Sequence, residues 1–408
     1  MTTTVNNEHK NIKVPNLRFK EFQGEWEEHL LGNISDVTKL AGFEFTKYVT
    51  YEDTGSIIAI RGLNCKNGSL DLRDVKYIDN SDFSKLSRSK LYVGDILYTY
   101  VGTVGEVAVV DKNDKYYLAP NVSRIRLSKD YNSDFIKQLL SSKKFYYKIV
   151  FPLIATSSQP ALSMENLRRF KLRVPSIKEQ KKIASLFNAI DERIATQNKI
   201  IEDLKKLKSA IIDYAIDSLD ADFVKFGYLY ETAGEGGTPT TSNAQFYDNG
   251  KIPFIKIDDL KQKYLTENKD FITELGLQKS SAWLVPTRSI LFSNGATIGE
   301  ITITTYPVCT KQGILGIVPK QNIDVEFLYY FMSSSYFKKA VSRIVTEGTM
   351  KTAYLKDINN ILCPIPTEGK QQEIAKMPSA LNSKIDIEQS ILKQLITQKR
   401  HLLRQMFI

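Results

Sequence analysis

An internal repeat with a period of about 192 residues is the feature of this sequence that most restricts its possible folds. Four blocks recur in the same order, and the spacing between them differs by only a few residues, which indicates a duplication. Between the blocks the two halves look unrelated, so a shared scaffold carries different connecting surfaces. The paired blocks are 57–64 with 252–259, 94–107 with 288–301, 134–149 with 326–341, and 162–184 with 353–375.

Each copy of the repeat predicts a small domain of strands and helices. The first block is a short strand ending at Arg61 or Lys256, and the second is a strand, a polar turn with T-[VI]-G-E, and another strand. Gly105 and Gly299 in that turn are expected at turn or bulge positions. The third block is an amphipathic helix interrupted by Ser-Ser, and the fourth is a short helix and a strand that ends at a proline.

A long helix is predicted after each of these prolines. Residues 176–216 contain neither Pro nor Gly, and their apolar residues alternate in steps of four and three, which is typical of a coiled coil. At 1.5 Å per residue such a helix is roughly 60 Å long. The predicted seam comprises Ile183, Phe187, Ile190, Ile194, Gln197, Ile201, Leu204 and Ile211 on the first helix and Ile374, Leu381, Ile385, Glu388, Leu392, Leu395 and Leu402 on the second.

Polar or helix-breaking residues interrupt this pattern, and two of the polar ones, Lys208 and Lys399, occupy equivalent places on the two seams. Gln197 and Glu388 occupy seam positions, where polar residues fix the register of paired helices at some cost in stability. The alternative is that both lie in water at the edge of the seam. Pro378 falls inside the second helix, which either kinks there or begins there.

A seam on one helix cannot be buried alone, and the chain offers two of equal length after two similar domains. Antiparallel pairing within the chain is the economical solution, although dimerisation through the seam stays open. The expected fold is therefore α+β, with two similar domains of mixed small sheets and helices separated by two long antiparallel coiled-coil helices, in a pseudo-two-fold repeat. The predicted boundaries are a flexible N-terminus 1–13, domains 14–175 and 218–365, and helices 176–217 and 366–408.

Composition indicates a folded, soluble, basic protein. Hydrophobic residues make up 42% and charged residues 25% of the 408 residues, and the formal net charge is +10, which favours a polyanionic partner. Cys65, Cys309 and Cys363 are far apart and form no CxxC pair, so neither disulfides nor a zinc site are expected. A cytoplasmic protein is expected, because residues 1–13 lack the apolar core of a signal peptide and no run approaches membrane-helix length.

Motifs for chemistry of its own are missing from the sequence. It has no GxxxxGK[ST] phosphate loop and no [DN]PP[YF] motif of an amino-methyltransferase. The Gly-rich stretch 234–242 follows no clear strand-to-helix pattern and is interpreted as a loop. His9, His29 and His401 are too scattered for a metal site or a triad. These absences favour an adaptor rather than an enzyme.

Several stretches resemble the specificity subunits of type I restriction-modification systems. They are VPNLRFKEFQGEWEEHLLGNI (14–34), GDILYTYVGTVGE, SSQPALSMENL, VPSIKEQKKIASLFNAID, SILFSNGATIGE and IPTEGKQQEIA. The resemblance covers nearly the whole chain, and the order of the motifs adds to its specificity. The second copy departs from the pattern, with Lys370-Gln371 in place of Glu179-Gln180.

The resemblance implies a division of labour. Two target-recognition domains would each bind one half of a split, asymmetric site in double-stranded DNA, and the paired helices would set the gap between the halves. Two modification subunits would dock on the helices and methylate adenine with S-adenosylmethionine. Restriction subunits would translocate and cleave DNA with ATP and Mg²⁺. The subunit itself would carry no cofactor and no metal.

Residues that read bases are expected where the shared scaffold gives way to loops. In such places Arg and Lys suit guanine, Asn and Gln suit adenine, and an acid can accept a hydrogen bond from cytosine; other contacts would reach only phosphate. The candidates are Arg61, Asn64, Tyr98, Tyr100, Thr103, Asn121 and Gln159 in the first domain and Lys256, Asp258, Asn294, Thr297, Lys311, Gln312 and Lys351 in the second.

Two other functions stay open. A solitary DNA-binding or scaffold protein with the same fold would lack a modification partner, and co-purification would distinguish it. A self-contained nuclease or methyltransferase would be active as an isolated chain.

Overall fold

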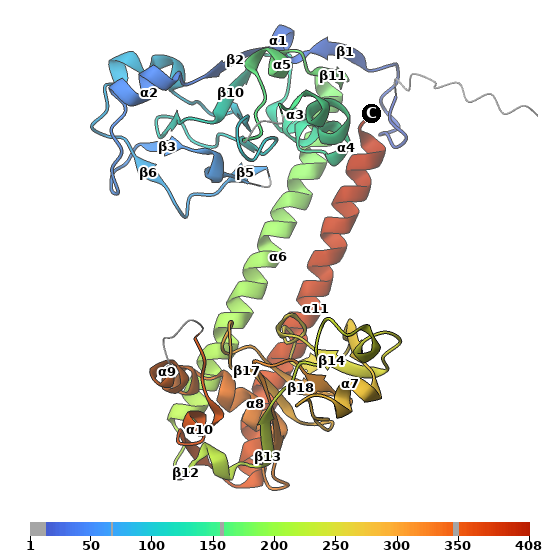
Figure 1. The fold of residues 1–408 in the computed structure, drawn as a ribbon. Coiled ribbons are helices and arrows are strands. Elements are labelled where there is room, and N and C mark those ends of the chain that lie inside the picture. The colour runs from blue at the N-terminus through green and yellow to red at the C-terminus, as the bar shows by residue number, and fades with distance from the viewer. Residues whose placement is uncertain (1–13, 67, 156–158, 346–350) are drawn as a thin grey trace, which may run out of the picture. The chain divides into compact units, whose positions relative to one another are not determined.

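The computed structural model describes residues 14–66, 68–155, 159–345 and 351–408, and the chain divides into two compact units. The first unit is formed by the chain up to Thr196 together with Leu392–Ile408, and the second by Gln197–Ile391. Two long helices, α6 (Ile177–Asp217) and α11 (Glu368–Met406), contribute to both units (Figure 1). No helix in the described ranges is both long and apolar enough to span a bilayer.

The first unit is built on a four-stranded antiparallel sheet in the order β2-β10-β7-β8. A smaller sheet, β6-β3-β9, contains a parallel pair, and β1 closes the domain against β11. Its strands are β1 (Glu27–Leu30), β2 (Ser35–Lys39), β3 (Ile58–Ile60), β4 (Cys65–Lys66), β5 (Ser69–Leu70), β6 (Lys76–Tyr77), β7 (Ile96–Thr99), β8 (Val107–Val109), β9 (Tyr116–Leu118), β10 (Val122–Leu127) and β11 (Lys171–Val174). Its shorter helices are α1 (Leu31–Ile34), α2 (Gly42–Tyr48), α3 (Ser133–Leu140), α4 (Lys143–Phe145) and α5 (Met164–Arg168).

The second unit repeats this arrangement. Its main sheet has the order β13-β20-β17-β18-β15, its smaller sheet β16-β14-β19 again contains a parallel pair, and β12 pairs with β21. The strands are β12 (Asp222–Lys225), β13 (Tyr230–Glu235), β14 (Ile252–Ile255), β15 (Tyr264–Leu265), β16 (Asp270–Ile272), β17 (Ile290–Ser293), β18 (Ile301–Thr304), β19 (Cys309–Thr310), β20 (Ile314–Pro319) and β21 (Leu362–Ile365). The helices are α7 (Glu274–Gln278), α8 (Val325–Ser333), α9 (Ser335–Ile344) and α10 (Leu355–Ile358). The predicted α+β fold with an internal repeat is confirmed.

A buried glutamine joins each domain to the first turn of its long helix. Gln180 donates to the carbonyl of Pro175 (2.8 Å) and accepts from the backbone amide of Asn132 (2.9 Å). In the second copy, 191 residues later, Gln371 donates to Pro366 (3.0 Å) and accepts from Asp324 (2.8 Å). Both glutamines are 1% exposed, and each satisfies a buried proline carbonyl and a half-buried amide.

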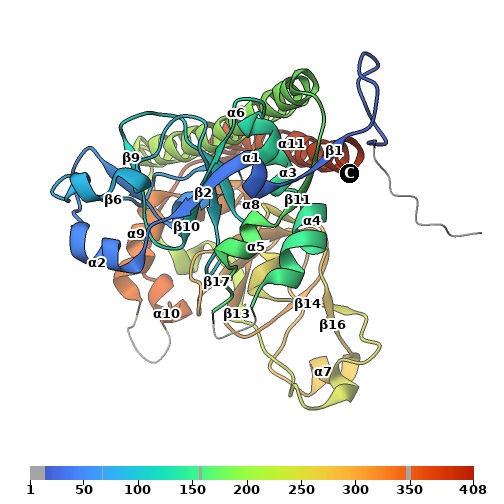
Figure 2. The same cartoon turned by 90° about the horizontal axis from the view of Figure 1, so that it is seen from above.

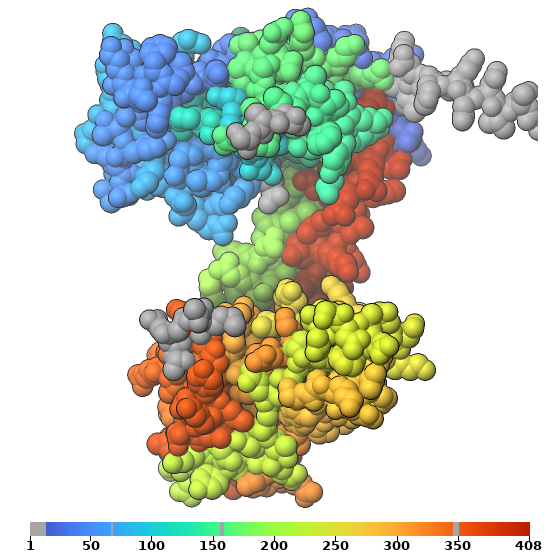
Figure 3. All heavy atoms as spheres, in the orientation of Figure 1, coloured from blue at the N-terminus to red at the C-terminus, as the bar shows by residue number. Residues whose placement is uncertain are grey.

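The two long helices pair within each unit (Figure 2). In the first unit, Phe187 of α6 packs on Phe407 just beyond the end of α11, and the two rings join a core that includes Trp26 and Phe135. Figure 3 shows this red end of the chain against the teal helices of the same unit. In the second unit, Gln197 bonds to Glu388 and Lys208 bonds to Asn382 (2.9 Å). Residue numbers rise along one helix as they fall along the other, so the pair is antiparallel.

The predicted seam residues are all buried or half-buried. Gln197 is 8% and Glu388 is 7% exposed, so the alternative in which both lie in water is wrong. Gln197 donates to the Glu388 carboxylate and also to its backbone carbonyl (3.1 Å). Their role in fixing the register stays a prediction.

Pro378 does not begin the second long helix, because α11 starts ten residues earlier at Glu368. A proline at this place cannot donate the hydrogen bond that the carbonyl of Ile374 would otherwise accept. The following residue, Ser379, is tied to the domain by hydrogen bonds with Lys263 (2.9 Å) and Glu326 (2.6 Å). These side-chain contacts fix the position of α11 next to Pro378, where the backbone hydrogen bond to Ile374 is missing.

Candidate nucleic-acid interface

The T-[VI]-G-E turns have the same hydrogen-bonded geometry in both domains. The Thr99 hydroxyl donates to the carbonyl of Thr103 and accepts from the amide of Glu106 (2.9 Å). The Ser293 hydroxyl makes the corresponding bonds with Thr297 and Glu300 (2.8 Å). Thr103 and Thr297 are exposed at the tips of these turns. The side chains of the tips are therefore presented by a rigid, repeated backbone.

Both turns are closed by glycines, as predicted. Gly105 and Gly299 have φ of +100° and +105°, a region that L side chains rarely adopt. A Cβ on Gly105 would lie 2.9 Å from the Tyr146 ring, whereas Gly299 has open space. A larger residue would be strained at either position, which explains why both copies use glycine.

Each tip is joined to the loop before the next sheet strand. The amide of Tyr100 donates to the carbonyl of Asn121 (3.0 Å), and the amide of Asn294 donates to Gly313 (3.0 Å). Asn121 and Gly313 both have positive φ, +72° and +91°. Asn tolerates this conformation better than most residues do, so the first copy keeps a polar side chain here and the second has none.

Three of the predicted residues of the first domain meet at one surface cavity. Arg61, Thr103 and Asn121 line a hollow of about 360 Å³ at the end of β3 and the tip of the β7–β8 turn. The remaining wall is mostly apolar and consists of Tyr51, Gly62, Leu63, Val101 and Pro120. Gln159 lies beside this turn, since its Nε2 is 3.6 Å from the place of a Cβ on Gly102.

The charge in this cavity is held in place by an ion pair. Arg61 Nη2 donates to Asp74 Oδ1 (2.7 Å) and to the Asp74 carbonyl (2.9 Å). Burial raises the pKa of the Tyr51 hydroxyl, and the positive charge of Arg61 opposes that shift. The partly neutralised guanidinium is better suited to an oriented contact than to general attraction of phosphates.

The second-domain candidates occupy the equivalent face. Lys256, Asp258 and Thr297 correspond to Arg61, Leu63 and Thr103, and Lys311 and Gln312 directly precede Gly313. All five of these candidates are exposed, with Lys256 paired to Asp270 (2.8 Å) and Asp258 to Lys261 (3.0 Å). Lys351 is exposed as well and follows the segment outside the described residues. This face is more polar than that of the first domain.

Three predictions of base contact are corrected by burial. Asn64, Tyr98 and Asn294 are 0–1% exposed. Asn64 caps its own turn by accepting from the Arg61 amide (3.0 Å) and donating to the carbonyls of Asp71 and Asp74. Tyr98 belongs to the core beneath β7, and Asn294 donates to Ala353 (3.2 Å). Tyr100 is 9% exposed, with Lys39 above its ring (5.4 Å), so it offers little surface.

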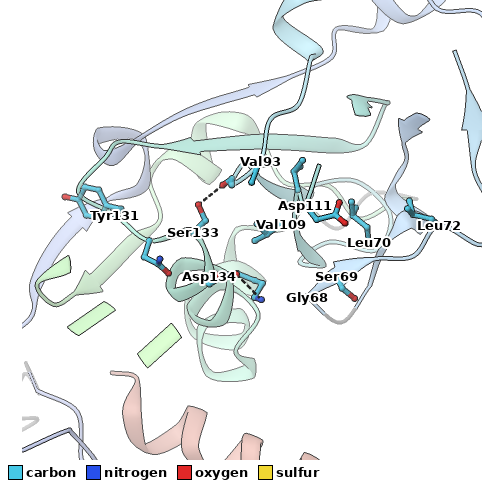
Figure 4. A pocket seen from close by; sticks show the side chains of 14 residues that line it. Gly68, Ser69, Leu70, Leu72, Val93, Val109, Asp111, Tyr131, Ser133 and Asp134 are labelled. Atoms are coloured by element: carbon cyan, nitrogen blue, oxygen red, sulfur yellow. Dashed lines mark hydrogen bonds and ion pairs between the residues drawn. The ribbon is translucent and has the colours of Figure 1, made fainter. Parts of the chain in front are cut away.

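A larger hollow of about 630 Å³ in the same unit does not belong to this face (Figure 4). It is lined by Asp111, Asp134 and the N-terminal turn of α3, where Ser133 donates to the carbonyl of Gly94 (2.6 Å). None of the predicted base-reading residues lines it. Its carboxylates disfavour phosphate, so we do not assign it to DNA.

The Gly-rich stretch 234–242 also serves packing. Gly234 and Glu235 end strand β13, and a Cβ on Gly236 or Gly237 would come within 2.2 Å of Thr310 or Ala282. These glycines let the loop approach neighbouring backbone. Among the described residues, no group of three or more potential metal ligands is found.

Sequence reasoning missed the apolar part of the cavity wall. Leu63 and Val101 have no hydrogen-bonding group that would mark them as base-reading residues, and Tyr51 lies outside the repeated blocks. One signal was present in the sequence: Leu63 aligns with Asp258 of the other copy, so an apolar residue occupies a position at which the repeat also accepts a charged one.

Comparison with known proteins agrees with this architecture. The model of a family described as the type I restriction modification DNA specificity domain matches residues 23–206 and again 220–397. A putative type I restriction enzyme MjaX specificity subunit from Methanocaldococcus jannaschii is 24% identical over 362 residues, covering 83% of each chain. The HindI specificity subunit from Haemophilus influenzae is 22% identical and covers 80% of this chain and 86% of that one.

Solved structures share the fold. The S subunit of a type I restriction-modification system from M. genitalium superposes with a TM-score of 0.59 at 17% identity, covering 97% of this chain and 99% of that one. A structure described in terms of complex assembly and conformational transition of the type I R-M system has a TM-score of 0.57 at 15% identity, covering 93% and 96%. Both likenesses extend over nearly the full length of the chain.

Proposed function

The chain belongs to the family of type I restriction-modification DNA specificity subunits, and we propose that each of its two domains reads one half of a split, asymmetric DNA site. The observation that carries this proposal is the repeated turn. Thr99 and Ser293 hold the same backbone, while the side chains around it differ: Arg61 and Leu63 in one copy, Lys256 and Asp258 in the other. Similar scaffolds with different surfaces suit the reading of two different sequences.

The long helices are proposed to set the unread spacing between the two halves. Their 41 and 39 residues give lengths of roughly 60 Å, against 34–36 Å for one turn of duplex DNA. The buried Gln197–Glu388 pair supports a fixed register. Inserting one heptad into each helix, on either side of this pair, is expected to lengthen the spacer of the recognised site and to leave both half-sites unchanged.

The same helices are proposed to dock two modification subunits. On α6, Ile200, Leu207 and Tyr214 recur at seven-residue intervals and are 38%, 49% and 77% exposed, which places them on one face beside the buried seam. Exposed apolar stripes of this kind mark protein interfaces. S-adenosylmethionine, and the ATP and Mg²⁺ of restriction subunits, would then be bound by the partners and not by this chain.

Docking is tested by co-purification of the full chain with its modification subunit. Leu207→Glu combined with Tyr214→Glu is expected to abolish the complex, because a charge would be buried in an apolar contact. Ser209→Glu, at an exposed position on another face of the same helix, is the matched control and should leave the complex intact. A chain that never retains a modification subunit would instead support the solitary DNA-binding protein.

Reading of the two halves is tested by mapping methylated adenines in cells with and without this protein. We expect a split motif with one modified adenine in each half. Exchanging residues 14–175 for those of a relative should change one half of the motif only, because β1 and β11 close this domain as one piece. A change in both halves, or a continuous motif, would refute the modular assignment.

A further inference from the structure

The cavity of the first domain has an unusual wall for a surface that meets DNA. Leu63 is 41% and Tyr51 38% exposed, and Val101 and Pro120 complete an apolar rim around Arg61. Contacts to phosphate come from charged and hydrogen-bonding groups, which the side chains of Leu63, Val101 and Pro120 lack. On a base-reading face, exposed apolar side chains have one specific target in the major groove, the C5-methyl group of thymine.

The polar members of the cavity also favour a base edge over the phosphate backbone. Asp74 bonds to Arg61 through Nη2 and partly neutralises its charge, which weakens non-specific attraction to phosphate. Thr103 and Asn121 are exposed beside it, on backbone fixed by the Thr99 turn and by the bond from the Tyr100 amide. An apolar wall beside a few oriented polar groups is a suitable pocket for the edge of one thymine, with its C5-methyl group and its hydrogen-bonding groups.

At two positions of this wall, those of Leu63 and Val101, the second domain has no hydrophobic side chain. At the positions of Leu63 and Val101 it carries Asp258 and Gly295, and Gly313 replaces Asn121. Asp258 is exposed and paired to Lys261, so a carboxylate stands where the first domain presents a leucine. A methyl group would gain little beside that carboxylate.

We propose that the first domain identifies a thymine in its half-site by enclosing the C5-methyl group between Leu63 and Val101. The inference rests on the proposed reading of one half-site by this domain. It names the chemical feature that is read and the two side chains that read it. If that half contains a modified adenine, it contains a T·A pair, so a thymine is available on one strand.

Deoxyuridine is the probe, because it pairs like thymidine and lacks only the methyl group. After the motif has been mapped, the full chain in complex with its modification subunit is titrated with duplexes in which each thymine of the first half is replaced singly. We expect one position at which affinity falls about fourfold, the effect of losing one buried methyl-sized group. Replacements in the second half should produce no loss that depends on Leu63 or Val101.

Substitution at the wall links that position to the cavity. Leu63→Ala and, separately, Val101→Ala should bring the affinities for the thymine and uracil duplexes to within a factor of about two, by removing the contact surface of the methyl group. Leu63 is well exposed, so the variant should fold. Asp258→Ala, at the matching position of the second domain, is the control and should leave the thymine-to-uracil ratio of the first half unchanged.

The outcomes separate this inference from the function on which it rests. Binding and methylation at a split motif, with no thymine of the first half sensitive to methyl loss, would overturn the proposed pocket alone. A sensitive thymine whose ratio survives both Leu63→Ala and Val101→Ala would overturn the assigned residues. Absence of any split motif would instead refute the proposed reading of half-sites.

Discussion

The two copies of the repeat agree in one kind of contact and differ in another. Bonds from a side chain to the backbone are kept: Gln180 and Gln371 each bridge a proline carbonyl and a helix-capping amide with nearly the same distances. Thr99 and Ser293 likewise close the same turn. The local backbone geometry at these places is common to both domains, so a side chain that hydrogen-bonds to the backbone makes the same bonds in each copy.

Some bonds between side chains have diverged, although Arg61–Asp74 and Lys256–Asp270 form equivalent ion pairs in the two copies. Glu179 is buried against Arg18, whereas its counterpart Lys370 is exposed and pairs with Glu373 (3.0 Å). In the first unit, Lys399 forms an ion pair with Asp191. In the second unit, the equivalent lysine, Lys208, instead forms a hydrogen bond with the neutral Asn382. In these examples the bonds directed to the backbone are kept in both copies, whereas the two side-chain pairs differ between them.

Loss of the Glu179 carboxylate should have the largest effect. Glu179 is 1% exposed and accepts from Arg18 Nε (2.8 Å) and Nη2 (2.7 Å). Glu179→Ala leaves the mostly buried Arg18 guanidinium without a counter-charge and bonded only to the carbonyls of Gln23 and Gly24, so we expect the first unit to lose about 3 kcal/mol of its free energy of unfolding. Lys370→Ala removes only an exposed ion pair and should cost less than about 1 kcal/mol. Hydrogen exchange resolved by peptide measures each unit separately, and similar losses in the two variants would contradict the comparison.

The bridging glutamines should be next, and here the two copies should behave alike. Gln180→Leu or Gln371→Leu leaves a buried carbonyl and a half-buried amide without this partner, which we expect to cost about 2 kcal/mol in the unit concerned. Faster exchange of the Asn132 amide in one variant and of the Asp324 amide in the other would report the loss locally. An effect confined to one copy would show that the same hydrogen bonds do not contribute equally to the free energy of unfolding of the two units.

Lysines at equivalent seam positions should respond with opposite signs. Burial holds the pKa of Lys208 below its ordinary value; the charge of Asp386 opposes this shift, whereas Lys263, Lys205 and Lys338 add to it. Lys208→Met should therefore stabilise the second unit by about 1 kcal/mol, because an incompletely paired charge leaves a half-buried site. Lys399→Met should destabilise the first unit by a similar amount, about 1 kcal/mol, since Asp191 loses its cation. Denaturant unfolding followed by exchange in each unit tests the two signs, and a shared sign would break the contrast.

The sequence was sufficient to predict the duplication, the long helices and their seam, because each depends on a periodic pattern that can be read locally. Helix α6 spans Ile177–Asp217, against a predicted range of 176–217. The sequence left the start of α11 ambiguous, because Pro378 has no backbone N–H to donate within a helix. The contacts of Ser379 with Lys263 and Glu326 join residues far apart in the sequence, so no local pattern predicts them.

The candidate site was predicted less completely, for a physical reason. Polar residue type does not distinguish a side chain that faces solvent from one that satisfies its own turn. Asn64 and Asn294 were chosen for their amides, and those amides bond to backbone inside the domain. Leu63 was overlooked because an exposed leucine can be recognised as part of a cavity only after the β3 and β7–β8 segments have been brought together.

The smallest expected effect concerns the seam position at which two equivalent residues of the repeat are in direct contact. Gln197 and Glu388 are equivalent residues, 191 positions apart, and they bond to each other. Hydrogen bonds from Lys384 and Gln197 hold the pKa of Glu388 below its ordinary value of 4.5. The folded chain therefore binds this proton more weakly than the unfolded chain does. The pair's contribution is present above the ordinary pKa and is lost as pH falls through the folded pKa.

Glu388→Gln should remove this dependence, because the amide does not titrate. Between about pH 5 and pH 3 the second unit of the unsubstituted protein should lose stability more steeply than that of the variant, as measured by denaturant midpoints across this range. Glu231→Gln, which replaces an exposed carboxylate on β13 of the same unit, is the control. If the slopes for Glu388→Gln and for the unsubstituted protein coincide, the ionised carboxylate does not stabilise the seam, and the register would have to depend on the apolar residues alone.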